Sequence, residues 1–204
     1  EGLDHTVKRP ARVQGLINKV DTMLKDDPKT ATKYPDLLGT MKRVLDGLSK
    51  EPVVVETQNF RTKQPITVGI SKIDLQFAIS FVFLRDPEYL KQMPRIFSDM
   101  DKGQFAEIGA YIGYIKSLSS SHNPMSIAMD SASGISAARW KLVQKEGQSS
   151  LVGRTTNFPF PDISNVVPVS DLGDEFRQPV KTAIPTLFLA GTLDGRTLYE
   201  SQLE

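Results

Sequence analysis

The sharpest candidate for chemistry in the sequence is an acidic residue close to its end. Asp194 comes shortly after an apolar run at residues 184–190 and directly before Gly195. A continuous apolar run of this kind is typical of a buried parallel strand. Open α/β folds bind ligands and place reactive groups just beyond the carboxyl ends of such strands. Asp194 is therefore a candidate catalytic acid, and the alternative is an Asx turn that only shapes the loop.

Other residue types that carry chemistry are scarce. The chain has no cysteine, which excludes thiol catalysis, disulfides and Cys-ligated zinc. Its two histidines, His5 and His122, are far apart in sequence, so neither a His-rich metal site nor a cofactor is expected. His122 follows three serines, but a polar loop is favoured over a Ser/His pair. His5 is expected to be exposed or orienting rather than a catalytic base.

The elements that would position these residues are mainly helical. Apolar residues recur with helical periodicity within residues 13–24 and 37–48, so both stretches predict amphipathic helices. Two β-branched runs between residues 53 and 70 predict a small β-hairpin. Ser71, with Asp74 three residues later, predicts the capped start of a central and mostly apolar helix.

Further helices are expected in the rest of the chain, together with a long irregular segment. The spacing of apolar residues predicts helices over about 86–100, 105–115 and 136–146, whereas the short apolar run 125–129 fits more than one element. Residues 150–183 contain several prolines and predict irregular structure with one helical turn near their end.

The segment that contains Asp194 also resembles a known family. Its sequence, IPTLFLAGTLDGRT at residues 184–197, is similar to the late strand and acid loop of α/β-hydrolases of the tripeptidyl-aminopeptidase and proline-iminopeptidase-like group, typically VPTLLLSGTLDGRTP. The first residues, EGLDHTVKRPAR, resemble the E-G-x-D-x-T-x-K-x-P segment that enters the cap of these enzymes. The stretches at 129–134 and 171–179 agree in order, so the resemblance covers essentially the whole chain. One departure is Leu198, because the family usually has proline after the threonine.

The resemblance implies two parts. Residues 1–183 would form the helical cap, or lid, domain of an α/β-hydrolase, with the hairpin at about 53–70, and residues 184–204 would supply one orphan core strand and the catalytic-acid loop. The family has a nucleophilic Ser at a G-x-S-x-G elbow, then the acid, then a His. Here the elbow is absent, its nearest approach being residues 130–134, and no His follows Asp194. The chain would hold only the acid of the triad, so we expect it to be inactive by itself.

A cap over a hydrolase site would select the substrate through an apolar pocket. The aromatic residues predicted to line this pocket are Tyr111, Tyr114, Phe158 and Phe160. Phe77, Phe81, Phe83 and Trp140 could line it as well, although aromatic residues at helical spacing are more often part of a core. The acidic candidates for binding a substrate's amino terminus are Glu88, Glu107 and Asp130, among which the spacing does not select. Arg196 either pairs with a carboxylate or is solvated.

Charge and hydropathy indicate the classes of partner. The 25 Lys and Arg residues nearly balance the 24 Asp and Glu residues, so no basic excess favours nucleic acid. No apolar run approaches about 20 residues, so no membrane span is expected. The resemblance implies the remainder of the hydrolase core as a partner, a peptide or small acyl substrate, and a periplasmic or secreted location. An unpaired strand at 185–190 would favour self-association.

Other functions stay open at this point. The main alternative is a self-contained, non-catalytic helical binding or interaction protein in which Asp194 is an ordinary loop residue. Because the sequence starts without Met and ends shortly after the acid loop, we expect a segment of a longer hydrolase instead. An esterase built on a Ser/His122 pair is the least favoured option.

Overall fold

The computed structural model describes residues 7–118, 123–179, 181–187 and 189–202. Within these ranges the chain is mainly helical and contains a two-stranded antiparallel hairpin, which confirms the predicted mainly α fold with a small β-hairpin. His5 and His122 lie outside the described residues, as does Phe188 of the predicted strand.

The chain begins with three helices whose ends are marked by proline and aspartate. α1 (Pro10–Asp26) starts with a proline in its first turn, where the missing N–H costs no hydrogen bond. Asp27 caps α2 (Pro28–Lys33), and Asp36 caps α3 (Leu37–Lys50), each through a carboxylate oxygen 2.9 Å from a backbone nitrogen of its helix. The buried apolar residues of α1 and α3 form the predicted stripes: Val13, Leu16, Ile17, Val20, Leu37, Met41, Val44, Leu45 and Leu48.

The hairpin is formed by β1 (Val53–Gln58) and β2 (Pro65–Ile70), as predicted. The strands are antiparallel, with Val55 opposite Val68. Side chains alternate between the two faces of the hairpin, so that Val68 and Ile70 are buried while Thr67 and Gly69 are exposed. One face is therefore available to pack against a helix.

The central helix lies in the core. Ser71 and Asp74 form the predicted capping box at the start of α4 (Lys72–Ala78). The helix continues directly into a π-helical turn, η1 (Ile79–Phe83), which the periodicity did not predict. Its fully buried residues are Leu75, Ala78, Ile79 and Phe83. α5 (Pro87–Asp101) then packs on α3, and Arg43 joins the two helices through hydrogen bonds of 2.8 and 3.2 Å to Asp101.

The next helix, α6 (Ala106–Leu118), lies directly on the hairpin. Two glycines one turn apart face the strands. A Cβ atom at Gly109 would lie 2.7 Å from Val55 Cγ2, and one at Gly113 would lie 2.7 Å from Ile66 Cδ1. The absence of these side chains lets the helix approach the hairpin closely.

The rest of the described chain contains short helices joined by long connections. α7 (Pro124–Ser133) includes the apolar run of undecided type, and α8 (Ala137–Ser149) matches the predicted helix at 136–146. The irregular segment contains two 3-10 turns, η2 (Thr155–Asn157) and η3 (Asp162–Asn165), and then α9 (Gly173–Phe176). The last described element is α10 (Tyr199–Gln202), which follows the acid loop.

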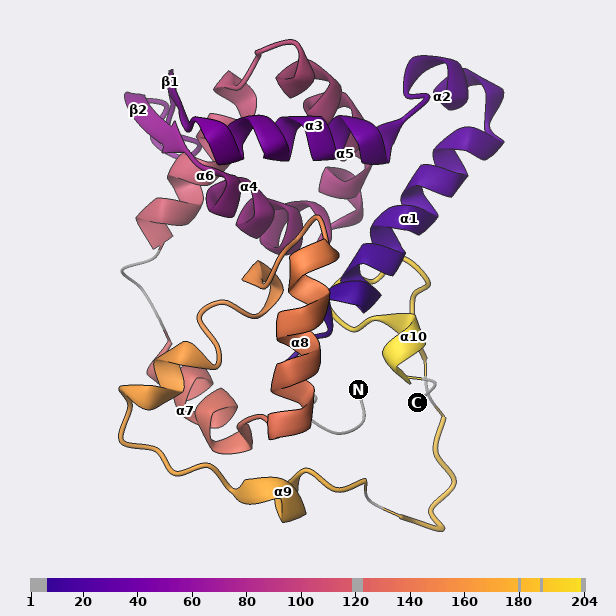
Figure 1. Ribbon diagram of the computed structural model, residues 1–204, viewed down its shortest axis with the longest axis vertical. Helices are drawn as coiled ribbons and strands as arrows, with labels where there is room; N and C mark the ends of the chain where they lie inside the picture. Colours follow the sequence, from indigo (N-terminus) through magenta and orange to yellow (C-terminus); the bar gives the residue numbers. More distant parts are fainter. Residues whose placement is uncertain (1–6, 119–122, 180, 188, 203–204) are drawn as a thin grey trace.

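Figure 1 shows how these elements are arranged. The hairpin and α3 to α6 form one group, whereas α7 and α9 lie at the opposite end of the molecule. α1 and α8 meet between these ends. There Arg9 donates hydrogen bonds of 2.5 and 3.1 Å to Glu146, which connects the start of α1 to α8. The segment before α10, residues 191–198, returns to the start of α1 (Figure 1).

The strand predicted at residues 184–190 is a point of difference. None of the described residues in this run is in a strand, and Ile184, Leu187 and Leu189 are 74%, 82% and 84% exposed. A strand needs hydrogen-bonding neighbours, and the hairpin is distant from this segment, which runs along the opposite edge of the molecule (Figure 1). The apolar pattern of a core strand is present, but the described chain supplies no sheet to receive it.

The close approach of α6 to the hairpin can be tested with alanine. Gly109→Ala should lower the free energy of unfolding by about 1–3 kcal/mol, because the new methyl group would displace the short, stiff side chain of Val55. Gly47→Ala, at an exposed position of α3 where a Cβ meets no atom within 4 Å, is the matched control and should stabilise by about 0.5–1 kcal/mol. Chemical denaturation measures both. Equal stabilisation by the two substitutions would contradict the close contact.

Candidate functional site

A cavity of about 630 Å³ lies between the central helix and α6. Its walls come from α4 and η1, from α6, and from the segment that includes η2 and residues 158–159. Phe60 from the hairpin loop, Arg85 and Asp86 from the turn after η1, and Tyr89 from the start of α5 complete the lining. A mainly apolar cavity of this size is typical of a small-molecule site.

Aromatic rings make up most of this lining. The Phe77 and Phe81 rings stack with their centroids 4.1 Å apart, and Phe158 meets Phe77 edge to face at 5.8 Å. Across the cavity, the Tyr111 ring contacts Tyr89 at 5.5 Å and Phe60 at 5.6 Å, and Phe60 lies 5.9 Å from Tyr114. We call these seven residues the aromatic cluster: Phe60, Phe77, Phe81, Tyr89, Tyr111, Tyr114 and Phe158.

The position of each wall follows from local packing. Phe77 and Phe81 are four residues apart, so they project from the same side of the central helix. Gln76 on this helix donates a hydrogen bond of 2.9 Å to Leu151 O, which holds the following segment against it. Gly153 has a φ of +57°, and a Cβ there would lie 2.9 Å from the Gln76 amide oxygen, so this turn requires glycine. The turn leads the chain to Phe158.

The structure brings together three of the four aromatic residues predicted to bind substrate. Tyr111, Tyr114 and Phe158 line the cavity, whereas Phe160 is half-buried outside its lining. The peptide chain has turned away by Phe160, whose backbone N–H donates to Asn157 O at 2.7 Å. Substrate binding by these residues stays a prediction.

Other members of the aromatic cluster differ in how far the sequence indicated them. Phe77 and Phe81 were possible pocket residues whose helical spacing favoured the core, and the structure places both in the lining of the cavity. Phe83, from the same stretch, is fully buried in the core, so the alternative interpretation holds for it. Phe60 and Tyr89 carried no signal, because their approach to α6 depends on the hairpin loop and on α5.

Four charged side chains also line the cavity. Asp74 accepts hydrogen bonds from Ser71 and forms an ion pair of 2.9 Å with Lys116. Asp86 caps α5 by accepting a hydrogen bond from Glu88 N at 2.8 Å. The fourth is Arg85, in the turn directly after η1.

The three acidic candidates for binding an amino terminus are not in the lining. Glu107 accepts two hydrogen bonds from Arg95, at 2.6 and 2.8 Å, which joins α6 to α5 and holds the pKa of Glu107 below its ordinary value. Glu88 is exposed and pairs with Lys91. Asp130 is on α7, beyond the described cavity walls.

The acid loop has a defined geometry. One oxygen of Asp194, Oδ1, accepts hydrogen bonds from the backbone nitrogens of Arg196 (2.7 Å) and Thr197 (3.1 Å), which is the Asx-type turn of the alternative interpretation. The other oxygen, Oδ2, accepts no hydrogen bond from the described residues, and the side chain is exposed. The loop thus orients the carboxylate and leaves one oxygen open to solvent.

Two contacts hold the acid loop on the helical body. A Cβ at Gly195 would lie 1.9 Å from Leu84 O at the end of η1, so the close approach requires glycine. Lys8, just before α1, donates a hydrogen bond of 3.1 Å to Gly195 O. Gly195 therefore makes room for the end of the central helix. The loop therefore sits next to the cavity wall that includes Arg85.

The nearest approach to a nucleophile elbow lies within a helix. Ser131 is on α7 and 2% exposed, and its Oγ accepts a hydrogen bond from Ser164 at 3.1 Å. The strand–turn–helix geometry that exposes a catalytic serine is not present there. Arg177 connects residues 129–134 with residues 171–179, the two stretches that resemble the family in the middle of the chain. It donates hydrogen bonds to Ser133 O at 2.8 Å and to Asp171 at 2.6 Å.

No protein-family model, curated protein or solved structure matches this chain. In the described ranges, no helix combines the length and the apolar character that a membrane span requires. Within the same ranges, no three potential His, Cys, Asp or Glu ligands are grouped as a metal site would need.

Asp74 makes one edge of the cavity sensitive to acid. Burial alone would raise the pKa of Asp74, but hydrogen bonds from Ser71 and Lys116 outweigh it and hold the pKa below the ordinary 3.8. A lowered folded-state pKa gives a stabilisation that is present above pH 3.8 and is lost as the pH falls through the folded-state value. Asp74→Asn should therefore reduce the free energy of unfolding clearly at pH 7 and much less at pH 2.5.

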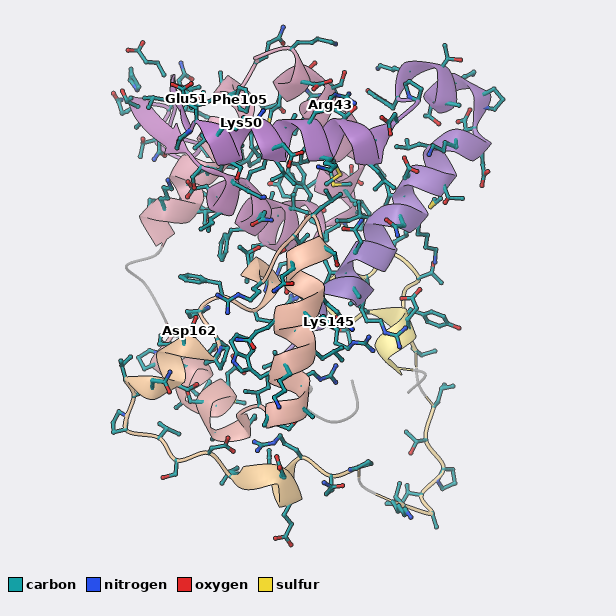
Figure 2. All side chains as sticks on the ribbon, viewed as in Figure 1. Arg43, Lys50, Glu51, Phe105, Lys145 and Asp162 are labelled. Atoms are coloured by element: carbon teal, nitrogen blue, oxygen red, sulfur yellow. The ribbon has the colours of Figure 1, made fainter. Side chains whose placement is uncertain are left out.

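Denaturant unfolding at the two pH values measures this difference. Asp162→Asn is the control, because the Asp162 side chain is exposed on η3 and has no partner among the described residues (Figure 2). This control should change stability little at either pH. A loss in Asp74→Asn that is equal at both pH values would contradict the assigned hydrogen bonds.

Proposed function

We propose that this chain is the cap, with the acid-bearing segment, of a serine hydrolase of the α/β-hydrolase type, acting on peptides or related amides and esters. The cap would cover the active site, exclude water and select the substrate through the aromatic cluster. The resemblance at both ends of the sequence motivates this proposal, and the following features of the structure support it.

The observation that carries the proposal is the meeting of the two ends of the helical body. Lys8 hydrogen-bonds to Gly195 O, and Lys19 on α1 donates to Thr192 O at 3.0 Å. The side chain of Asn157 joins this junction through hydrogen bonds of 2.7 and 2.8 Å with the Lys8 backbone. A domain inserted between two neighbouring strands of a core must enter and leave at one place. This geometry fits such an insertion.

The state of the Asp194 carboxylate supports the role of triad acid. A triad acid is oriented by hydrogen bonds and accepts one more from the Nδ1–H of the catalytic His, which fixes the imidazole tautomer and stabilises its positive charge. Asp194 has one oxygen held by two backbone N–H groups and the other free of partners in the described chain. The histidine and the serine would come from the hydrolase core.

Exposed apolar side chains offer a surface for that core. Large apolar residues that are more than half exposed concentrate after residue 124, on α7, α9 and the run 184–190. Figure 2 shows the side chains of the last segment projecting from a ribbon that runs apart from the main body. Exposed apolar surfaces of this kind are typical of interfaces with another domain or another chain.

The proposal predicts the effect of removing the acid from the complete protein. Asp194→Asn should lower kcat for hydrolysis of a peptide p-nitroanilide by about 10⁴-fold, because the amide holds the wrong histidine tautomer. Asp162→Asn, which changes an exposed acid elsewhere, should leave kcat unchanged. Fluorophosphonate labelling should mark a serine in the complete protein and none in the 204-residue chain alone.

Two results would contradict this assignment. One is a reading frame whose flanks contain no G-x-S-x-G before this segment and no histidine after it. The other is full hydrolytic activity in Asp194→Asn. Either result would favour the second candidate function, a helical binding protein, which is supported by the fact that the described residues form the cavity without any further domain.

The exposed run at 184–190 leads to a separate prediction about the isolated chain. Because Leu187 and Leu189 are largely exposed, the segment should pair with a second copy of the chain when the hydrolase core is missing. Replacing both residues with Lys should weaken self-association by at least about tenfold, because the free energy gained by burying the leucine side chains would be lost. Val54→Lys, at an exposed apolar position of β1, is the matched control.

Sedimentation velocity over a range of concentrations measures this association. Wild type and Val54→Lys should form dimers or larger species, and the double variant should remain monomeric. A wild-type chain that is monomeric at every concentration would refute the prediction.

A further inference from the structure

The aromatic cavity contains a cation that no described group balances. Arg85 lines the cavity directly after η1, and its guanidinium carbon lies 4.2 Å from the centroid of the Phe81 ring. A guanidinium placed over a ring face can still use its N–H groups for other partners. Among the residues that the structure describes, Arg85 has no hydrogen-bonding or ion-pair partner for its side chain.

The other charged groups of the cavity already have partners. Lys116 pairs with Asp74 and also donates to Gly69 O at 2.8 Å. One oxygen of Asp86 is used to cap α5. Arg85 is therefore the cation of this lining that is available to a ligand.

A second arginine increases the positive potential at this place. Gly195 contacts Leu84 so closely that their chain neighbours, Arg196 and Arg85, lie near one another. Burial lowers the pKa of Arg85, and the charge of Arg196 lowers it further, although arginine stays protonated in proteins. Arg196 likewise has no side-chain partner in the described ranges. Two neighbouring arginines that form no ion pair with the described residues favour an anion.

We propose that the cavity binds an aromatic or apolar molecule that carries a carboxylate, with its carboxylate on Arg85 and its apolar body among the rings of the aromatic cluster. The planar guanidinium matches a carboxylate through two parallel hydrogen bonds. A volume of about 630 Å³ is large enough for a molecule of several rings or a short peptide. The inference goes beyond the proposed hydrolase function, because binding requires no nucleophile and can be measured on this chain alone.

A matched set of probes tests the proposal. 2-Naphthoate and its neutral isostere 2-naphthamide share one ring system and differ in charge. Titration calorimetry on the 204-residue chain should give an affinity for naphthoate about tenfold higher than for naphthamide, as expected for a charge-assisted hydrogen bond. Arg85→Gln should abolish this preference while leaving the naphthamide affinity unchanged. Tyr111→Ala should weaken both ligands together.

The chain supplies a control for the arginine. The guanidinium carbon of Arg154 also lies over an aromatic ring, 5.3 Å from the Trp140 centroid, but Arg154 does not line the cavity. Arg154→Gln should keep the tenfold preference. Arg85→Lys retains the charge without the planar guanidinium and should keep only part of the preference. This variant also tests the proposal if Arg85→Gln does not fold.

Three outcomes would overturn the proposal. They are equal affinity of the two probes for wild type, no binding of either probe at millimolar concentration, and a preference that survives in both Arg85 variants. Because none of these measurements involves turnover, they are independent of whether Asp194 serves a hydrolase.

Discussion

Burial of the central helix is the interaction on which the other parts of the structure depend. Leu75, Ile79 and Phe83 are fully buried on one side of α4 and η1, where α3, α5 and α6 pack around them. The opposite side of the same helix presents Phe77 and Phe81 to the cavity. Its end, at residue 84, receives the acid loop. One rigid helix thus connects the core, the aromatic cluster and the candidate catalytic acid, so a change in its packing would alter all three.

The cavity and the acid loop meet at the end of η1, which gives the two proposals a common location. Arg85 belongs to the cavity, and the neighbouring loop holds Asp194 with one oxygen bound by backbone N–H groups. In a hydrolase, this proximity would bring a ligand held by Arg85 to the edge of the site that the acid serves. In a binding protein, the same arginine would anchor the ligand and Asp194 would only shape its loop. The two functions differ in what the rest of the protein supplies.

Local chemistry made much of the fold predictable. Helices with apolar stripes, the hairpin and the capping box at Ser71 depend on contacts within a few residues, and each is present where the pattern indicated it. The run at 184–190 shows the limit of such patterns. Its composition describes a buried strand, but a strand also requires neighbouring strands, and those are not part of the described chain. The spacing of apolar residues did not predict the π-helical turn of η1 either, because that turn depends on how the helix fits the core.

The sequence by itself determined the mainly helical fold, the ends of several helices and the turn that orients Asp194, because these rest on backbone hydrogen bonds between near neighbours. Only the tertiary structure decided which aromatic residues share a cavity. It placed Phe60 with Tyr111 and left Phe160 outside. It also showed that Gly109 and Gly195 are needed where two chain segments approach closely. Contacts between distant segments depend on the packing of whole elements, and residue spacing along the chain carries no direct record of that packing.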